Sequence, residues 1–377
     1  MTSLFIEFFK LGLIAFGGPA AHIGYFQQTF VHKLGWLSQK RFAELMALCQ
    51  LLPGPTSSQV GMAIGRERAG WPGALLAFVA FTLPSAALMI GAGLGLGWLL
   101  DWSYSGGVIH GLKLLAVLVV GQAVWTMARS LLPDRATRTL ALVILALLLL
   151  LANGGQLWLL LAAAVFGAIA LRPLPDDVEE QPGVTGGLWR LPTAIGLLTL
   201  LSLLPWQGLG ELVRTGSLVF GGGHVVLPLL EETELVRGGM SEQGFLAGYG
   251  LAQAMPGPLF SFAGFIGAGS TLGPGGIQGG LLALAAIYLP SFVLLWGVLP
   301  TWQRLRHLNW LQGAIRGANA AVIAILAAIF YDPLWTSSVT DPKSGALLVL
   351  GAALMLVWRL PVWAMVALAV TAGALFL

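Results

Sequence analysis

The stretch QLLPGPTSSQ, residues 50 to 59, decides how this chain must fold. It lies in an apolar region, yet Pro53, Gly54 and Pro55 cannot continue a helix, because proline lacks a backbone N–H and clashes with the carbonyl four residues back. Backbone groups freed in this way are tolerated at membrane depth only where they are buried in protein or line a watery cavity. The stretch therefore predicts a broken helix at a binding site.

The composition places this turn in a membrane protein. Of the 377 residues, 57% are hydrophobic and 9% are charged, whereas a soluble domain is about 25% charged. A helix needs about 20 residues to cross the hydrocarbon core. Candidate segments are expected at 3–22, 71–98, 106–131, 138–153, 155–171, 211–230, 275–300, 312–331, 345–358 and 361–377. We therefore predict an all-α polytopic membrane protein with about ten spanning helices.

Several other classes of protein are disfavoured by the residue types. The single cysteine, Cys49, excludes an intrachain disulfide and is too isolated for a metal cluster. Glu7 and the lack of a small-residue cleavage site argue against a removable signal peptide. The chain has no HExxH, no GxSxG and no pair of aspartates on one helix. We expect no enzyme activity, no cofactor, no metal and no nucleic-acid partner, whereas the lipid bilayer is an expected partner.

An internal repeat places the same turn twice in the chain. FGGPAAHIGYF (16–26) recurs as FGGGHVVLPLL (220–230), CQLLPGPTSSQVGMAIG (49–65) as AQAMPGPLFSFAGFIGA (252–268), and FTLPSAAL (81–88) as IYLPSFVL (287–294). The order is the same in both copies, and the spacing between copies changes only from 204 to 203 to 206 residues. Three ordered matches indicate a tandem duplication.

The duplication sets the expected domain boundaries. The first transmembrane repeat covers 1–172 and the second covers 205–377. Between them, RPLPDDVEEQPGVTGGLWR (172–190) is rich in proline, glycine and acidic residues, as solvated linkers are. The run 191–204 is short for a span. We therefore expect 173–204 to be a cytoplasmic linker followed by an interfacial segment.

The basic residues predict that the two repeats are inverted. In the first half they follow the first segment, the PGP segment and the segment 106–131, but the second half has EETE (231–234) and GAGSTLGPGG (267–276) at the first two places. Its basic cluster, WQRLRH (302–307), falls where the first half has DWSYSGG (101–107). Because Lys and Arg favour cytoplasmic loops, the halves should face opposite ways.

The same rule favours a re-entrant hairpin at the PGP motif. Lys40 and Arg41 precede it and Arg66 and Arg68 follow it, so both ends of the segment should lie on one side of the membrane. Five spans and one re-entrant element in each half would account for the inversion. Inverted repeats with broken helices are typical of secondary transporters, whose substrate binds near the midplane.

The broken helices predict an anion site. A half-helix that begins after Pro55 points free N–H groups and the positive end of its dipole inward, which favours an anion. The FGG turns allow a similarly close approach of backbone. The residues expected to supply backbone at the site are Gly17, Gly18, Pro53, Gly54, Pro55, Gly221, Gly222, Pro256, Gly257 and Pro258.

The paired FGGP/FGGG and PGP motifs, with LPS following in both halves, resemble the chromate transporter family, in its long-chain form with two repeats. The resemblance covers nearly the whole chain except the linker. It implies a bacterial inner-membrane protein that exports chromate, a tetrahedral oxyanion similar to sulfate. It also implies that the proton motive force drives export and that the activity gives chromate resistance.

Polar residues beside the PGP turns are candidate contacts for the oxyanion. Gln50 and Gln253 precede the two turns by three residues and could donate amide hydrogen bonds or cap the interrupted helix. Ser57, Ser58 and Ser261 follow the turns, where hydroxyls bind an oxyanion or cap a helix. Glu44 is a proton-coupling candidate because it is an acid inside an apolar stretch, and its alternative is a surface partner for Lys40 or Arg41.

Histidines and cations form a second group of candidates. His22 and His224 follow the FGG turns, and histidine titrates near neutral pH, although a packed histidine is the commoner case. Arg66 offers a planar fork to an oxyanion, or belongs to a solvated cluster with Glu67 and Arg68. Lys113 and Arg316 are expected as cationic walls of the pathway, with Asn319 beside Arg316; the alternative is snorkelling to the interface.

Two questions stay open at this point. Re-entrant half-helices can also form a passive anion channel, and the transported anion could be sulfate or another small oxyanion instead of chromate. The residues also do not say whether the halves meet within one chain or across a homodimer. Saturation and dependence on a proton gradient would distinguish a transporter from a channel.

Overall fold

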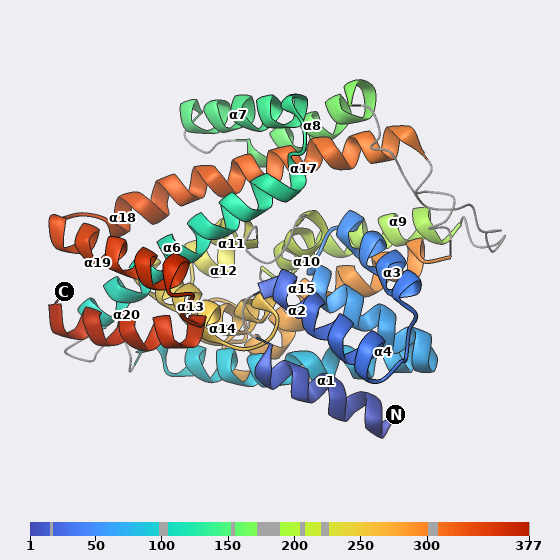
Figure 1. Ribbon diagram of the computed structural model, residues 1–377, viewed down its shortest axis with the longest axis horizontal. Coiled ribbons are helices and arrows are strands. Elements are labelled where there is room, and N and C mark those ends of the chain that lie inside the picture. The colour runs from blue at the N-terminus through green and yellow to red at the C-terminus, as the bar shows by residue number, and fades with distance from the viewer. Residues whose placement is uncertain are drawn as a thin grey trace.

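The first repeat folds as a series of helices interrupted at its glycine and proline motifs (Figure 1). The structure, a computed structural model, describes residues 1–15, 18–97, 105–151, 155–171, 189–203, 208–219, 226–300 and 308–376. The helices of the first repeat are α1 (Thr2–Ile14), α2 (Gly18–Phe26), the π-helical η1 (Gln27–Lys33), α3 (Gln39–Leu51), α4 (Thr56–Leu94), α6 (Ser105–Leu131), α7 (Arg135–Leu150) and α8 (Gln156–Ala170). Within the described ranges no strand is found, which confirms the all-α prediction.

The second repeat has a similar order of elements. A short helix, α9 (Arg190–Ser202), precedes it and packs against α15 through Ala194 and Gly297. The repeat then contains α10 (Leu209–Leu218), α11 (Val226–Glu231), α12 (Glu234–Arg237), α13 (Glu242–Ala254), η3 (Leu259–Ser261), α14 (Phe262–Gly269), α15 (Gly276–Val298), α17 (Asn309–Ile329), η4 (Phe330–Trp335), α18 (Thr336–Ser338), α19 (Pro342–Ala352), η5 (Ala353–Val357) and α20 (Val362–Phe376).

Four of the described helices are long and apolar enough to cross a membrane: 56–94, 106–129, 276–298 and 309–338. They coincide with expected spans, and further apolar helices are shorter. The expected continuous segments 3–22 and 211–230 are not single helices, because α1 ends at Ile14 and α10 ends at Leu218. Two consecutive glycines follow the first of these ends and three follow the second, and glycine costs a helix about 1 kcal/mol relative to alanine.

A sharp break divides α4 into a half-helix, 56–68, and a long helix, 71–94. Ala69 and Gly70 leave the helical conformation, and Gly70 has a φ of +65°. The two parts then fold against each other, with Gly65 facing the carbonyl of Gly73. The second repeat has the same arrangement, since Gly267 on α14 faces the carbonyl of Gly279 on α15. Small residues permit this close contact of backbones.

The two repeats are interlocked through their outer helices. Helix α6 of the first repeat packs on α20 of the second, where Gly111 faces Ala369. Helix α17 of the second repeat packs on α8 of the first, where Gly317 faces Ala163. Positions 111 and 163 of the first repeat correspond to positions 317 and 369 of the second, 206 residues later. The two contacts are therefore equivalent. Each repeat is therefore completed by a helix of the other.

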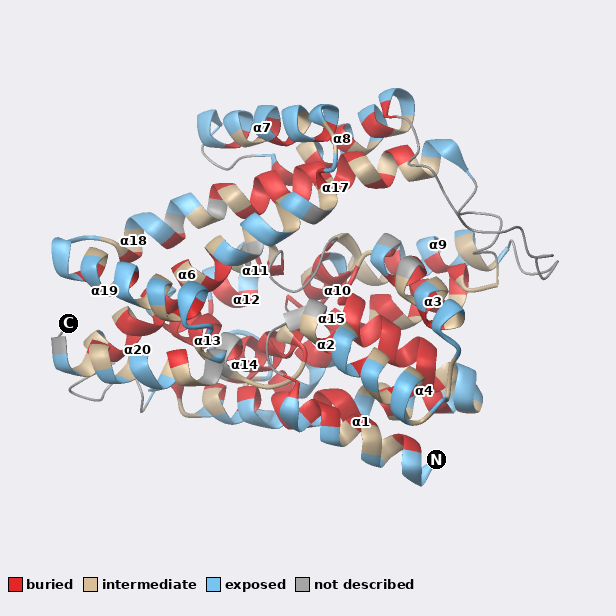
Figure 2. Cartoon of the chain, viewed as in Figure 1, coloured by how far each residue is buried: buried red, intermediate tan, exposed pale blue. Residues whose placement is uncertain are grey.

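The equivalent helices α4 and α15 run antiparallel where they touch. Phe78, early in the long part of α4, contacts Tyr288 and Phe292, whereas Ile90, twelve residues later, lies against Gly280. Residues later in the sequence of one helix thus contact residues earlier in the sequence of the other. Together with α14, these helices carry many of the buried residues of the described chain (Figure 2).

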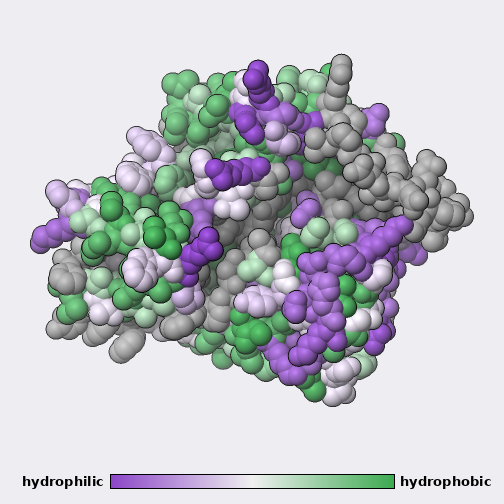
Figure 3. Space-filling model, viewed as in Figure 1, coloured by the Kyte–Doolittle hydropathy of each residue, from purple (hydrophilic) through white to green (hydrophobic). Residues whose placement is uncertain are grey.

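The outer helices expose apolar side chains. Leu142 and Leu150 on α7 and Ile169 on α8 are largely exposed, although large aliphatic side chains avoid water. Figure 3 shows hydrophobic side chains over much of one face, with hydrophilic ones gathered over the end of the molecule that carries α3. A surface of this kind is typical of a multi-pass membrane protein, in which lipid covers the apolar helices.

Candidate functional site

Both PGP motifs form the tips of hairpins whose ends meet. In the first hairpin, Arg41 at the start of α3 forms an ion pair of 2.6 Å with Glu67 at the end of the half-helix 56–68. In the second, the N–H of Thr271 after α14 donates to the carbonyl of Gly239 before α13, at 2.8 Å. The chain therefore enters and leaves each hairpin at one end, with Pro53-Gly54-Pro55 or Pro256-Gly257-Pro258 at the other.

Each tip is held by the opposite repeat through its backbone. The Gly54 N–H donates to the carbonyl of Val219 at 2.5 Å, and the Gly257 N–H donates to the carbonyl of Ala15 at 2.9 Å. Ala15 and Val219 end the segments that precede the two FGG motifs, 204 positions apart. The hydrogen bonds are therefore equivalent and exchanged between the repeats. They supply partners for backbone groups that a proline-containing turn leaves outside any helix.

The central residue of each tip must be glycine. Gly54 has a φ of +119° and Gly257 a φ of +98°, conformations that residues with a side chain rarely adopt. A Cβ at Gly54 would lie 2.8 Å from Ser291 Oγ, and a Cβ at Gly257 would lie 2.9 Å from Ser85 Oγ. Ser85 and Ser291 are the serines of the two LPS motifs, and each of them contacts the PGP tip of the other repeat.

Buried amide and hydroxyl groups gather around Gly54 and Gly257, and this region between the two hairpin tips is called the junction. Gln59 Nε2 donates to the carbonyl of Pro53 at 2.7 Å and approaches Ser291 Oγ at 3.5 Å. Ser85 Oγ lies 2.7 Å from Ser261 Oγ. All of these side chains are buried. Sequence reasoning missed Gln59, Ser85 and Ser291, although the repetition of LPS was a signal that could have found the two serines.

His22 connects the two hairpins. Its Nε2 lies 3.0 Å from the carbonyl of Ala15, and its Nδ1 lies 3.2 Å from Ser57 Oγ. A carbonyl only accepts, so Nε2 carries the proton, and in the neutral ring Nδ1 accepts from the Ser57 hydroxyl. The Ala15 carbonyl also accepts from Gly257, so His22 bridges the start of the first half-helix and the second tip. The imidazole is buried edge-on against Phe81, as in a packed histidine.

Several expected site residues lie away from the two tips. Glu44 forms an ion pair with Arg41 at 2.9 Å, at the base of the first hairpin. Arg66 stacks on Trp71, with its guanidinium carbon 5.2 Å from the ring centre. Eleven residues of helix separate it from Pro55, about 16 Å at 1.5 Å per residue. Gln50 is exposed, and the buried amide beside the first turn belongs to Gln59 instead.

Of the two expected cationic walls, Arg316 is engaged outside the tips. Arg316 forms an ion pair with Asp134, which caps the N-terminus of α7. The electrostatic partner for Arg316 therefore comes from the first repeat, outside the junction. Lys113 and Asn319 are half-buried on α6 and α17, and Lys113 forms no ion pair with any described residue.

Some predictions fall on residues that the structure does not describe. Gly17, Gly221, Gly222 and His224 lie outside the described residues, and for Gly18 and Gln253 only the backbone is described. In the described part of the chain no group of three or more His, Cys, Asp or Glu side chains could hold a metal ion.

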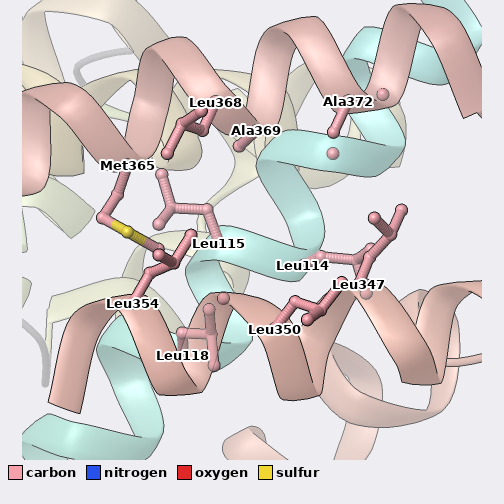
Figure 4. Close-up of a pocket in the computed structure, with 13 residues that line it drawn as sticks. Leu114, Leu115, Leu118, Leu347, Leu350, Leu354, Met365, Leu368, Ala369 and Ala372 are labelled. Carbon is pink, nitrogen blue, oxygen red and sulfur yellow. The ribbon is translucent and has the colours of Figure 1, made fainter. Parts of the chain in front are cut away.

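A pocket between α6, α19 and α20 offers a contrast to the hydroxyl-rich junction (Figure 4). It has a volume of about 190 Å³. Leucines line most of it, with Met365, alanines and glycines completing the wall. Side chains of this kind offer no hydrogen bond to an oxyanion, so this pocket is not the expected anion site.

Sequence comparison identifies related proteins over both repeats. The family described as "Chromate transporter" matches residues 2–168 and 206–374. A "Chromate transport protein" of Pseudomonas aeruginosa is 28% identical over 357 residues, covering 87% of this chain and 80% of that protein. One of Cupriavidus metallidurans is 26% identical over 371 residues, covering 95% and 88%. An "Uncharacterized transporter" of Methanocaldococcus jannaschii is 23% identical over 339 residues, covering 87% and 83%. No solved structure matches the chain.

Proposed function

The chain belongs to the chromate transporter family, and from this membership and the geometry of the hairpin tips we propose that it is a secondary transporter of chromate. Chromate is a tetrahedral dianion. Members of the family from two bacteria carry the name chromate transport protein and align with 87% and 95% of this chain. We propose the same substrate for this protein.

The observation that carries the proposal is that each hairpin tip is hydrogen-bonded to the opposite repeat. Gly54 is bound to Val219 and Gly257 to Ala15, so two interrupted helices meet at one buried junction. The half-helix 56–68 and η3 followed by α14 begin at this junction and direct their N-terminal amides toward it. Such amides bind anions without a full positive charge nearby. The proposed site therefore lies between the tips and includes the hydroxyls of Ser57, Ser58 and Ser261.

We propose that the repeats are inverted across the membrane, with the first at 1–172, the linker and interfacial segment at 173–204, and the second at 205–377. The antiparallel packing of α4 and α15 supports this arrangement, because equivalent helices of inverted repeats run in opposite directions. The distribution of basic loops supports it independently. In this orientation both PGP hairpins are re-entrant and meet near the midplane.

The transport cycle follows from how the tips are held. Each tip is tied to the opposite repeat by one backbone hydrogen bond and one LPS serine, so few bonds must break for a hairpin to separate. Separation on alternate sides would expose the buried junction to one aqueous phase at a time, which is alternating access. His22 would move with this contact because it is bonded to Ser57 of the first hairpin and to the Ala15 carbonyl, which also holds the second tip. The Glu44–Arg41 pair is assigned to the base of the hairpin, not to proton transfer.

We further propose that transport is outward across the bacterial inner membrane, is driven by the proton motive force and gives chromate resistance. The test is uptake of radiolabelled chromate into everted, energised membrane vesicles, with and without an uncoupler and with excess sulfate. Saturable uptake that collapses with uncoupler is expected. Uptake that neither saturates nor responds to uncoupler would identify a channel. No uptake above that of empty vesicles, with insertion of the protein verified, would contradict the assignment of chromate.

A further inference from the structure

Four hydroxyl groups meet where the long helices pass the two hairpin tips. The Tyr288 phenol on α15 faces the hydroxyls of Ser58, Thr82 and Ser261. All four side chains are buried, with exposed fractions of 1% for Tyr288, Ser58 and Ser261 and 4% for Thr82. Two of these residues follow the PGP turns, and the other two directly precede the LPS motifs of α4 and α15. The cluster therefore combines residues beside the PGP and LPS motifs of both repeats.

The four hydroxyls form two equivalent pairs. Ser58 and Ser261 are 203 positions apart, the spacing of the PGP motifs, and Thr82 and Tyr288 are 206 apart, the spacing of the LPS motifs. Each repeat therefore contributes one hydroxyl from a hairpin and one from a long helix. A tetrahedral oxyanion has four equivalent oxygens arranged about two-fold axes. Two pairs of donors related by a pseudo-two-fold axis match that shape.

Three of these hydroxyls face one another without a well-formed hydrogen bond. The hydroxyls of Ser58, Thr82 and Tyr288 are fully buried and form no bond of acceptable geometry, although they lie near one another. Buried polar groups are usually paired, so a cluster of unpaired hydroxyls indicates that another molecule supplies the partner. A hydroxyl donates to an anionic oxygen, and hydrogen bonds to charged groups are stronger than those between neutral groups.

We propose that Tyr288 is a direct contact for the transported oxyanion and, with Ser58, Thr82 and Ser261, forms a neutral four-hydroxyl site. The proposal rests on the proposed transport function and names the side chains that read the substrate. Tyr288 differs from its counterpart Thr82 because a phenol is more acidic than an alkyl hydroxyl and is the stronger donor. The site is therefore uneven, with its strongest donor on the second repeat.

Replacement of Tyr288 by phenylalanine tests the contact without removing the ring. The ring packs against Phe78, with centres 4.7 Å apart, and Phe260, at 5.9 Å, and both contacts survive the substitution. The matched control is Tyr249→Phe, because Tyr249 on α13 is equally buried and packs against Phe262 on α14. Thr82→Val removes the counterpart hydroxyl while keeping nearly the same volume.

Two measurements report on the variants. The KM for chromate uptake in everted vesicles is expected to rise about 10- to 100-fold for Tyr288→Phe, the loss of one hydrogen bond to a charged group, and less for Thr82→Val. Thermal unfolding of the detergent-purified protein with chromate, sulfate or molybdate reports binding without transport. Tyr288→Phe should lose most of the stabilisation by these anions and keep the unfolding midpoint of the anion-free protein.

The outcomes separate this inference from the proposed function. If wild type transports chromate and Tyr288→Phe has the same KM and the same stabilisation by anions, Tyr288 does not contact the substrate and the inference is overturned. An equal loss in Tyr249→Phe would also overturn it. If wild type is stabilised by sulfate or molybdate but not chromate, and Tyr288→Phe removes that effect, the site stands while chromate as substrate fails. If no anion stabilises wild type, both proposals fail.

Discussion

The two PGP hairpins are alike at their tips and different at their bases. At the tips, Gly54 and Gly257 have the same kind of backbone conformation and donate to equivalent carbonyls of the opposite repeat. At the bases, the first hairpin is closed by the charged group Arg41, Glu44 and Glu67. The second is closed by uncharged bonds, in which Thr271 donates to Gly239 and Ser270 donates to the carbonyl of Leu235.

This difference follows from what each part of the hairpin must do. The tips meet each other and, in the proposed mechanism, hold one anion between them, so their geometry is shared. The bases lie away from the tips, and in the proposed inverted arrangement the basic loops of the two halves face opposite ways. Under these proposals, the shared site constrains the tips, whereas the orientation of each half in the membrane sets the charge of the base. The following substitutions test that division, from the largest expected effect to the smallest.

The largest effects are expected at the tips. Gly54→Ala and Gly257→Ala place a Cβ against a serine of the opposite repeat and force a conformation that costs about 1–3 kcal/mol. Both should reduce chromate uptake about 100-fold or more, and replacement of Pro53-Gly54-Pro55 by three alanines should abolish it without preventing insertion. The control is Gly91→Ala on α4, where a Cβ meets nothing within 4 Å. Normal uptake by the triple variant would contradict a site between the tips.

The two LPS serines should differ in how much they contribute to the free energy of unfolding. Ser85→Ala removes the 2.7 Å contact with Ser261 and leaves a buried hydroxyl without that partner, which costs about 1–3 kcal/mol. Ser291→Ala removes only a 3.5 Å approach to Gln59, whose amide keeps its 2.7 Å bond to Pro53. Chemical unfolding in detergent should show a large loss for Ser85→Ala and under about 0.5 kcal/mol for Ser291→Ala. Equal losses would mean that the two contacts are energetically equivalent.

The bases should respond differently to salt. Arg41→Gln breaks partly exposed ion pairs, which contribute about 0–1 kcal/mol and are screened by ions. Ser270→Ala removes a buried 2.8 Å hydrogen bond to Leu235 and should cost about 1 kcal/mol at any ionic strength. Unfolding midpoints in 0.05 M and about 1 M salt separate the two. A salt-independent loss in Arg41→Gln would show that its role is packing, not charge.

The smallest effect is expected at the N-terminus of the outer helix α7. Asp134 caps α7, and its pKa is lowered by the backbone N–H of Thr137 and by Arg316. A carboxyl group whose pKa is lowered by folding stabilises the folded state at pH values above its usual pKa. This stability is lost as the pH falls through the lowered pKa. Asp134→Asn should remove under about 1 kcal/mol, because the carboxylate is 39% exposed. Unfolding midpoints between pH 3 and 7 should converge for the two proteins in acid.

The hairpins themselves could be predicted from sequence because their causes are local. Pro53 and Pro55 break the helix wherever it lies, and the basic residues on both sides of the motif place its ends together. The contact between Arg41 and Glu67 agrees with that prediction. Ser58 and Ser261 were chosen by their position after the turns, and both are buried at the junction. Effects that act within a few residues can be predicted from a single sequence.

The partners could not be predicted, because they depend on packing between distant segments. Gln50 and Gln59 flank the same turn, and only the direction of the half-helix decides that Gln59 is the buried amide. Arg316 was expected to face the pathway because it interrupts an apolar helix, but Asp134 of the other repeat is its ion-pair partner. Thr82 and Tyr288 have no sequence signal beyond their place before LPS. Their proposed role follows only from the packing of the two repeats against each other.

The exchange of tips also sets the order in which the protein can be built. The Gly54 N–H has its acceptor in Val219, 165 positions later, and Gln59 reaches Ser291 across 232 residues. During synthesis, the first hairpin is therefore inserted long before the groups that complete it exist. The contacts of its tip with the second repeat cannot all form until α15 has been synthesised, since contacts between distant residues form late. A nascent first repeat is thus an assembly intermediate, and segments of the second repeat determine when the first hairpin is completed.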